Sequence, residues 1–144
     1  MGDFEISRAW PNQNLVTQLT NKPMPPINNH YMKWKVIAYE SARKEKLVKD
    51  FIKSLENETR SKVGRLISLL QIHGNLLRMP YSKKITKDIF ELRIRGVDEI
   101  RIFYAFGKGK VIYLLHGFKK KSQKTSIREI IIAEKRLKEA LDKV

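Results

Sequence analysis

The sequence predicts an α+β domain with a small antiparallel sheet, in which the elements follow the order β-α-α-β-β-β-α. Two observations predict the strands: residues 89–95 alternate between apolar and polar side chains, and two apolar runs flank the turn sequence GKGK at 107–110. Alternation is typical of a half-buried strand, and a glycine turn between apolar runs indicates a hairpin. A third observation predicts the helices, because apolar residues recur at helical spacing in three other segments.

The first half of the predicted domain contains one strand and two helices. The strand is expected at 34–40, where WKVIAYE is rich in aromatic and β-branched residues. Two amphipathic helices follow, the first capped by Ser41 and the second ending at Gly74, which is a natural helix stop. Their apolar stripes are Leu47, Val48, Phe51, Ile52 and Leu55 in the first helix and Val63, Leu66, Ile67 and Leu70 in the second. The short link between them predicts a helical hairpin.

The second half contains three strands and a helix. In the strand at 89–95, Phe90, Leu92 and Ile94 lie on one face, and Glu91, Arg93 and Arg95 lie on the other. The runs at 99–106 and 110–118 are apolar on nearly both faces, which predicts central strands. A final helix is expected from residue 126, with a stripe of Ile127, Ile130, Ile131, Leu137 and Leu141. We expect one sheet, with the helices on one face and the charges on the other face or its rim.

The composition sets the domain organisation and points to a polyanionic partner. The chain has 144 residues, 42% of them hydrophobic, and a formal net charge of +15. Residues 1–31 are electrically neutral and rich in proline and asparagine, so they are expected to be a flexible extension, with one domain at 32–144. All the excess charge lies in that domain. Such a charge exceeds what solubility requires and favours a nucleic acid, a ribosome, an anionic membrane or an acidic protein.

Several classes of protein are excluded or disfavoured. The absence of cysteine excludes disulfides and thiolate catalysis, and the three histidines lack the spacing of metal ligands, so neither a metal nor a cofactor is expected. Glu91, Asp98 and Glu99 are weak evidence for a metal-dependent nuclease, and we favour solvated charges. The N-terminus has no secretory signal, and no apolar run is long enough to cross a bilayer. The expectation is a soluble cytoplasmic protein that does not bind a membrane.

Basic residues on three successive strands are the main candidates for a functional site. Arg93, Arg101 and the lysines at 119–121 can converge, because neighbouring strands lie about 5 Å apart. Arg101 interrupts an apolar strand, so it must either pair with an acid such as Glu91 or project into a cleft. Arg93 is either an ordinary exposed charge or a phosphate ligand, and the lysine run is either a solubilising strand end or a phosphate contact. Phosphate contact is the interpretation we prefer.

Further residues near these cations could assist them. Tyr104, Tyr113 and Phe118 could stack on bases, although aromatic residues in strands more often belong to the core. His116 is the only histidine in the predicted sheet, and it is either a buried, hydrogen-bonded residue or a catalytic one. Lys124 precedes Thr125 and Ser126, either of which could cap the final helix, where backbone N–H groups also favour anions.

The motifs FELRIRG at 90–96 and IRIFYAFGKGKVIYLLHGFKKKSQKT at 100–125, taken in order, resemble those of the RelE/HigB superfamily of type II toxin–antitoxin toxins. The resemblance covers about residues 32–142 and is strongest to the phage-derived branch, in which Glu-Leu-Arg, Arg-(Val/Ile)-x-Tyr and Leu-His-x-Phe-x-Lys-Lys-x-x-Lys-Thr recur. Two positions depart from the pattern: Ile100 stands where an aromatic residue is usual, and Ser126 where many relatives have proline. Residues 1–31 have no counterpart.

The resemblance implies a RelE-like toxin that cleaves mRNA on the ribosome and is neutralised by an antitoxin, acidic or with a helix-turn-helix domain. It places the catalytic positions on Arg93, Arg101, Lys119 and Lys120, assisted by His116. Arg95, Tyr104, Lys121 and Lys124 would contact the nucleic acid. The expected chemistry is metal-free attack by the substrate's 2′-hydroxyl, with the arginines on the phosphate. Two alternatives stay open: a ParE-like inhibitor of DNA gyrase with the same fold, and a non-catalytic basic module that binds nucleic acid.

Overall fold

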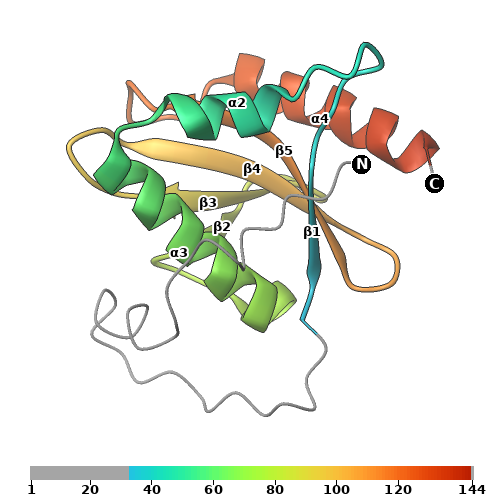
Figure 1. Ribbon diagram of the computed structural model, residues 1–144, viewed down its shortest axis with the longest axis horizontal. Coiled ribbons are helices and arrows are strands. Elements are labelled where there is room, and N and C mark those ends of the chain that lie inside the picture. The colour runs from blue at the N-terminus through green and yellow to red at the C-terminus, as the bar shows by residue number, and fades with distance from the viewer. Residues whose placement is uncertain (1–32, 144) are drawn as a thin grey trace.

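The structure is a computed structural model that describes residues 33–143 of the chain (Figure 1). It confirms the α+β class and every predicted element. The predicted extension at 1–31 lies outside the described residues. The elements, in chain order, are β1 (Lys35–Ala38), α2 (Leu47–Ser54), α3 (Asn57–His73), the 3-10 turn η1 (Gly74–Leu76), β2 (Ser82–Lys84), β3 (Phe90–Ile94), β4 (Ile100–Gly107), β5 (Val111–Lys119) and α4 (Ile127–Asp142).

The sheet has five strands in the order β1-β5-β4-β3-β2. Strands β2 to β5 form the antiparallel part, but β1 runs parallel to β5, with Lys35 opposite Val111 and Ala38 opposite Leu114. The predicted antiparallel sheet is therefore a mixed one. The short edge strand β2 is additional to the predicted strands. Its sequence, Ser-Lys-Lys, has no alternating apolar pattern, and the strand joins the sheet through backbone pairing with β3.

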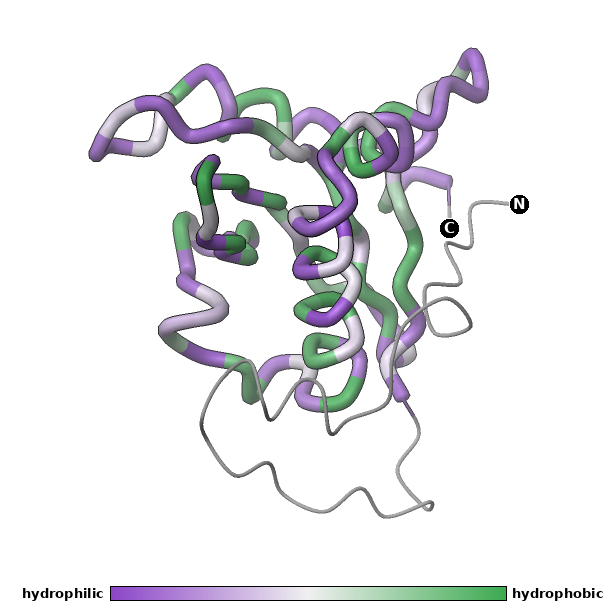
Figure 2. The backbone as a smooth tube through the Cα atoms, turned by 60° about the vertical axis from the view of Figure 1, so that its left-hand side comes forward, coloured by the Kyte–Doolittle hydropathy of each residue, from purple (hydrophilic) through white to green (hydrophobic). Residues whose placement is uncertain are grey.

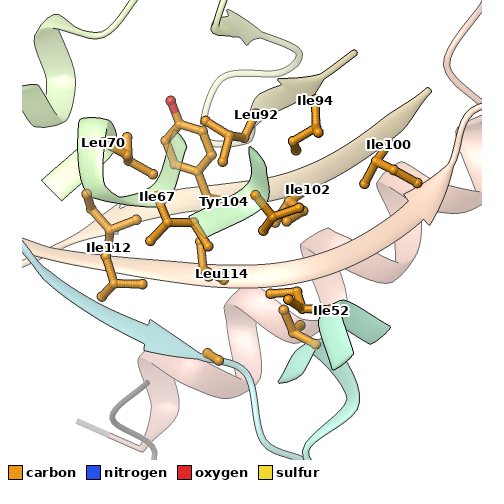
Figure 3. Close-up of a cluster of buried hydrophobic side chains, with 14 of the residues drawn as sticks. Ile52, Ile67, Leu70, Leu92, Ile94, Ile100, Ile102, Tyr104, Ile112 and Leu114 are labelled. Atoms are coloured by element: carbon orange, nitrogen blue, oxygen red, sulfur yellow. The ribbon is translucent and has the colours of Figure 1, made fainter. Parts of the chain in front are cut away.

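Helices cover both faces of the sheet, so the prediction that they lie on one face is wrong. Helices α2 and α3 pack on one face, where Ile52, Ile67 and Leu70 meet a row of side chains from the strands (Figure 3). Helix α4 packs on the other face against Phe103 and Leu115. Each face of β4 and β5 is buried for this reason, which explains why both strands are apolar on both faces.

Helix α4 docks through smaller residues than expected. Its buried residues are Ala133 and Leu137, with Ile130 and Ala140 packed beside them. By contrast, Ile127, Ile131 and Leu141 are 73%, 59% and 48% exposed, so the predicted stripe is wrong at these three positions. Two of these four contacts come from the small residues Ala133 and Ala140, which a stripe of large apolar residues does not include.

The boundaries of the helical hairpin follow local backbone chemistry. The Ser41 hydroxyl accepts the Glu45 N–H at 3.0 Å, so it caps a turn, and α2 begins six residues later, at Leu47. Gly74 ends α3 as predicted, with φ at 52°, and its N–H donates to the Leu70 carbonyl. A Cβ at Gly74 would lie 2.1 Å from the Trp34 indole, so this position needs glycine for space as well as for conformation.

A β-bulge in β5 changes which residues point toward α4. Phe103 pairs with His116 and Tyr104 pairs with Leu114, which leaves Leu115 without a partner of its own. Leu115 packs against α4, and His116 is hydrogen-bonded to the same helix, so consecutive residues face the same side. From His116 onward the alternation of β5 is therefore inverted.

Hydropathy along the backbone agrees with this layering. Hydrophobic and hydrophilic residues alternate along the helical turns in Figure 2, as expected for helices with one face on the sheet. Among residues 33–143, no helix is long and apolar enough to cross a membrane.

Candidate functional site

One end of the sheet carries an open cleft of about 540 Å³. Strand β3 ends there, β4 begins there and β5 ends there, because the three strands are antiparallel neighbours. The residues that line the cleft are Arg93, Arg95, Glu99, Arg101, Lys120, Lys121, Ser122 and Gln123. Five of them are cationic and one is acidic. A concave surface with this excess of positive charge attracts anions more strongly than the same charges spread on a flat surface.

Arg101 is the most deeply placed cation of the cleft, with an exposed fraction of 3%. Its Nε atom lies 3.4 Å from Glu91 Oε1, its Nη2 atom lies 2.8 Å from Glu99 Oε2, and its Nη1 donates to the Ile100 carbonyl at 3.0 Å. Both interpretations of Arg101 are therefore true together. It is paired with acids, and its side chain also lines the cleft.

Glu91 is a buried counter-ion for two arginines. Its exposed fraction is 1%, so the interpretation of Glu91 as a solvated charge is wrong. Its two oxygens lie 3.4 Å from Arg101 Nε and 3.9 Å from Arg93 Nε. Glu91 Oε1 and both Nε atoms make no hydrogen bond within the described part of the chain, so the contact is electrostatic. The negative charge between two guanidinium groups reduces the repulsion that would otherwise oppose packing them on adjacent strands.

Glu99 reaches the same guanidinium from the solvent side. Its side chain is 43% exposed and lines the cleft, and its backbone carbonyl accepts the Lys120 N–H at 2.7 Å. That backbone hydrogen bond holds Lys120 beside the start of β4. The sequence alone predicts Glu99 to be a solvated charge, with a metal ligand as the alternative. Its position two residues before Arg101 is the signal that could have placed it, because residues i and i+2 of a strand share a face.

The lysine run divides between the two sides of the sheet. Lys120 and Lys121 line the cleft, as do Arg93, Arg95 and Arg101. Lys119 is not among the lining residues. It pairs with Ile100 in register, on the face of α2 and α3, and its ammonium lies 3.3 Å from Asp98. Lys124 is exposed and also does not line the cleft. The bulge in β5 causes this division, because it inverts which residues of the strand share a face with Arg101.

His116 lies against α4 and is not among the residues that line the cleft. Arg136 Nη1 donates to His116 Nδ1 at 3.2 Å, so Nδ1 is an acceptor, and the ring proton lies on Nε2, which donates to Glu129 at 2.5 Å. Burial lowers the pKa of His116 below its ordinary value, against the opposing effect of Glu129. Of the two interpretations of this residue, the structure matches the buried, hydrogen-bonded one.

Tyr104 points away from the cleft, into the core between the sheet and α3. It is 1% exposed, its ring stacks on Phe90, and its hydroxyl is hydrogen-bonded to Ser82. Burial raises its pKa to about 12. The expected contact between Tyr104 and nucleic acid therefore does not fit this structure. Tyr113 and Phe118 also pack in the core under α4, so these three aromatic residues fit the core interpretation.

The described residues offer no cluster of side chains suited to binding a metal ion. No group of three or more histidine, cysteine, aspartate or glutamate side chains within 33–143 could hold a metal ion. Glu91 and Glu99 are engaged by Arg101, and Asp98 is engaged by Lys119. The acids of this region are therefore counter-ions of basic residues.

Ser122 and Gln123 add polar side chains to the cleft. These two residues are not among the candidate site residues that the sequence predicts.

Comparison with protein families adds an independent line of evidence. Residues 50–138 match the family model of phage-derived Gp49-like proteins (DUF891). The match extends from α2 into α4 and includes all of the residues that line the cleft. A search of curated proteins found no match. The chain belongs to the family of phage-derived Gp49-like proteins, a toxin-like family related to the RelE and HigB toxins.

Proposed function

We propose that the protein is the toxin of a type II toxin–antitoxin system and acts as a ribosome-dependent, metal-independent endoribonuclease on mRNA. The observation that carries the proposal is the convergence of five basic side chains in one cleft at the end of the sheet. A phosphodiester is the common substrate group that such a cleft recognises. Membership of a toxin-like family supports the same conclusion.

The chemistry assigned to the cleft needs no metal ion. The 2′-hydroxyl of the RNA attacks the adjacent phosphorus, and negative charge builds up on the non-bridging oxygens. Arg101 and Arg93 bind these oxygens and stabilise the charge, because guanidinium groups match phosphate geometry and stay protonated. Lys120 adds charge and donates a proton to the leaving 5′-oxygen. The products are a 2′,3′-cyclic phosphate and a free 5′-hydroxyl.

Other basic residues extend the contact with RNA. Arg95 and Lys121 lie in the same cleft and bind neighbouring phosphates. Lys119 and Lys124 lie outside it and are assigned to the electrostatic attraction of the RNA or the ribosome. Because the net charge is +15, a large part of the affinity comes from released counterions and falls as salt is added.

A toxin-like protein implies an antitoxin partner. The charge of the cleft indicates how that partner acts. An antitoxin with acidic side chains over Arg93, Arg95 and Lys121 would pair with the cations that bind RNA. It would thereby compete with the phosphate backbone for the same site. A helix-turn-helix antitoxin could block the cleft in the same way if it carries an acidic segment that reaches these cations.

The test is induction of the full chain in bacteria without antitoxin, followed by mapping of mRNA 5′ ends. We expect growth arrest and new cuts within reading frames. Arg101→Ala and Lys120→Ala should reduce cutting about 100-fold or more, because each removes a group that stabilises the transition state. Lys108→Ala is the matched control, since Lys108 is an exposed cation in the turn between β4 and β5, at the opposite end of both strands.

Each outcome assigns the protein to one class. New cuts that depend on Arg101 and Lys120 support the ribonuclease. Growth arrest with intact mRNA would contradict it and indicate a gyrase inhibitor, which a supercoiling assay would then detect. Absence of arrest would indicate a basic module that binds nucleic acid without cleaving it.

Arg101 is buried among carboxylates, so the thermal unfolding of Arg101→Ala must be measured beside that of wild type. Lys120 is more exposed than Arg101, and Lys120→Ala is expected to fold normally.

A further inference from the structure

Glu99 is the single carboxylate among the described residues that line the cleft. The other groups around it are guanidinium and ammonium groups and the polar side chains of Ser122 and Gln123. An acidic side chain in an anion-binding cleft weakens phosphate binding, because it repels the ligand and occupies a donor of Arg101. Its presence there therefore calls for a role other than binding.

We propose that Glu99 is the general base that accepts the 2′-hydroxyl proton during RNA cleavage. This assignment rests on the proposed ribonuclease function. RNA cleavage without a metal needs such a base, and the arginines of the cleft cannot provide it because they stay protonated. A carboxylate oxygen, by contrast, can accept a proton directly.

The position of Glu99 relative to Arg101 brings it within reach of the attacking group. Glu99 Oε2 lies 2.8 Å from Arg101 Nη2, and the guanidinium has further N–H groups with which to bind a phosphate oxygen. In a reactive arrangement the attacking oxygen lies about 3 Å from the phosphorus. A phosphate on Arg101 therefore places its neighbouring 2′-hydroxyl beside the Glu99 carboxylate.

Other groups that could take the proton are held elsewhere. Glu91 is 1% exposed behind Arg101 and has no access to the cleft. His116 is hydrogen-bonded at both ring nitrogens, to Glu129 and Arg136 on α4. Asp98 lies 3.3 Å from the Lys119 ammonium and does not line the cleft. Among residues 33–143, Glu99 combines a carboxylate, access to the cleft and contact with Arg101.

The proton balance of the step is complete with groups of the cleft. The 2′-oxygen forms a bond to phosphorus and loses its proton to Glu99. The bond between phosphorus and the 5′-oxygen breaks, and the leaving oxygen takes a proton from the Lys120 ammonium. Exchange with water then returns Glu99 to the carboxylate and Lys120 to the ammonium. No oxidant, reductant or other co-reactant is required.

In the free protein the same carboxylate competes with the substrate. Glu99 is paired with Arg101, and its side chain is 43% exposed, so it can release the guanidinium and remain in the cleft beside the 2′-hydroxyl when a phosphate enters. Glu99 is the solvent-facing partner of the pair, so an entering phosphate can take its place on the Arg101 guanidinium. Removal of the charge should therefore slow cleavage and leave RNA binding unchanged or tighter. A purely structural role would not produce that combination.

The experiment compares Glu99→Gln, Glu99→Asp and wild type as purified full-length proteins. Cleavage is measured on mRNA bound to ribosomes, and binding is measured with a single-stranded oligoribonucleotide whose 2′-hydroxyls are methylated and cannot attack. We expect Glu99→Gln to lower the cleavage rate at least about 100-fold and to bind as tightly as wild type or more so. Glu99→Asp should keep part of the activity.

Asp98→Asn is the matched control, because it removes the same charge from the adjacent residue outside the cleft. It should cleave at the wild-type rate. The assignment is overturned if Glu99→Gln cleaves as fast as wild type or faster, or if Asp98→Asn loses activity to the same extent. If wild type itself does not cleave, the proposed function fails and the assignment of Glu99 fails with it. If wild type and Glu99→Gln both cleave, only the assignment of Glu99 fails.

Discussion

Arg93 and Arg101 lie directly opposite each other on β3 and β4, and one buried carboxylate, Glu91, lies within 3.9 Å of both. Two cations in this cross-strand position repel each other. Glu91 reduces that repulsion from below the cleft, while the side chains of both arginines remain among those that line it. The positive charge of the cleft therefore depends on a buried negative charge that does not itself line the cleft.

Replacement of Glu91 by glutamine should destabilise the fold strongly. The change leaves Arg101 buried without its inner counter-ion, which costs about 3 kcal/mol or more of unfolding free energy. Urea unfolding followed by circular dichroism measures the loss. Glu99→Gln is the control, because its carboxylate is 43% exposed and its removal should cost less than about 1 kcal/mol. Equal effects of the two substitutions would contradict the view that burial makes Glu91 the structural partner.

Lys121→Ala should weaken RNA binding and reduce its dependence on salt. Each phosphate contact that is lost lowers the slope of log K against log salt concentration by about 0.7 for a single strand. The measurement is fluorescence anisotropy of a methylated oligoribonucleotide over a series of salt concentrations. Lys108→Ala removes an equal charge at the opposite end of β4 and should have the smaller effect. A similar slope change in both variants would indicate diffuse attraction rather than a specific cleft.

Tyr104→Phe should leave RNA cleavage and RNA binding unchanged. The hydroxyl is buried on the face of α3 and is hydrogen-bonded to Ser82, so its removal affects stability alone. The expected cost is about 1 kcal/mol, seen in thermal or urea unfolding. Ser82→Ala tests the same hydrogen bond from its other partner. A loss of RNA affinity in Tyr104→Phe at wild-type stability would show that the hydroxyl contacts the RNA.

Acid should destabilise the contact between α4 and the sheet. Burial lowers the pKa of His116 in the folded protein below the ordinary value of 6.5, so the unfolded chain binds a proton more readily. The stability contributed by the neutral ring is therefore present above pH 6.5 and is lost as the pH falls toward the folded pKa. Protonation also places a proton on Nδ1, which faces the Arg136 guanidinium.

Histidine resonances in an NMR titration measure this directly. His116 should titrate below 6.5, and His73 should do so as well, since burial also lowers its pKa. Unfolding free energies measured between pH 8 and pH 5 should fall less steeply in His116→Gln than in wild type. An unshifted His116 titration would contradict the burial of the ring between β5 and α4.

Much of the fold was predictable from local patterns. Alternation at 89–95 placed Phe90, Leu92 and Ile94 on the core face and Arg93 on the polar face, and the structure has this arrangement. The apolar runs on either side of GKGK predicted β4 and β5, and helical spacing predicted α2, α3 and α4. These features depend on residues a few positions apart, so the sequence contains them directly.

The tertiary structure decided which of the candidate residues meet. The pairing of β1 with β5, the placement of α4 on the second face and the inclusion of β2 depend on contacts between distant segments. The bulge at Leu115 inverts the alternation of β5, so Lys120 shares the cleft with Arg101 while Lys119 lies on the opposite face. The pattern of β5 itself does not reveal the bulge, because both faces of the strand are apolar. One extra residue, accommodated by packing against α4, thus determines which lysine reaches the site.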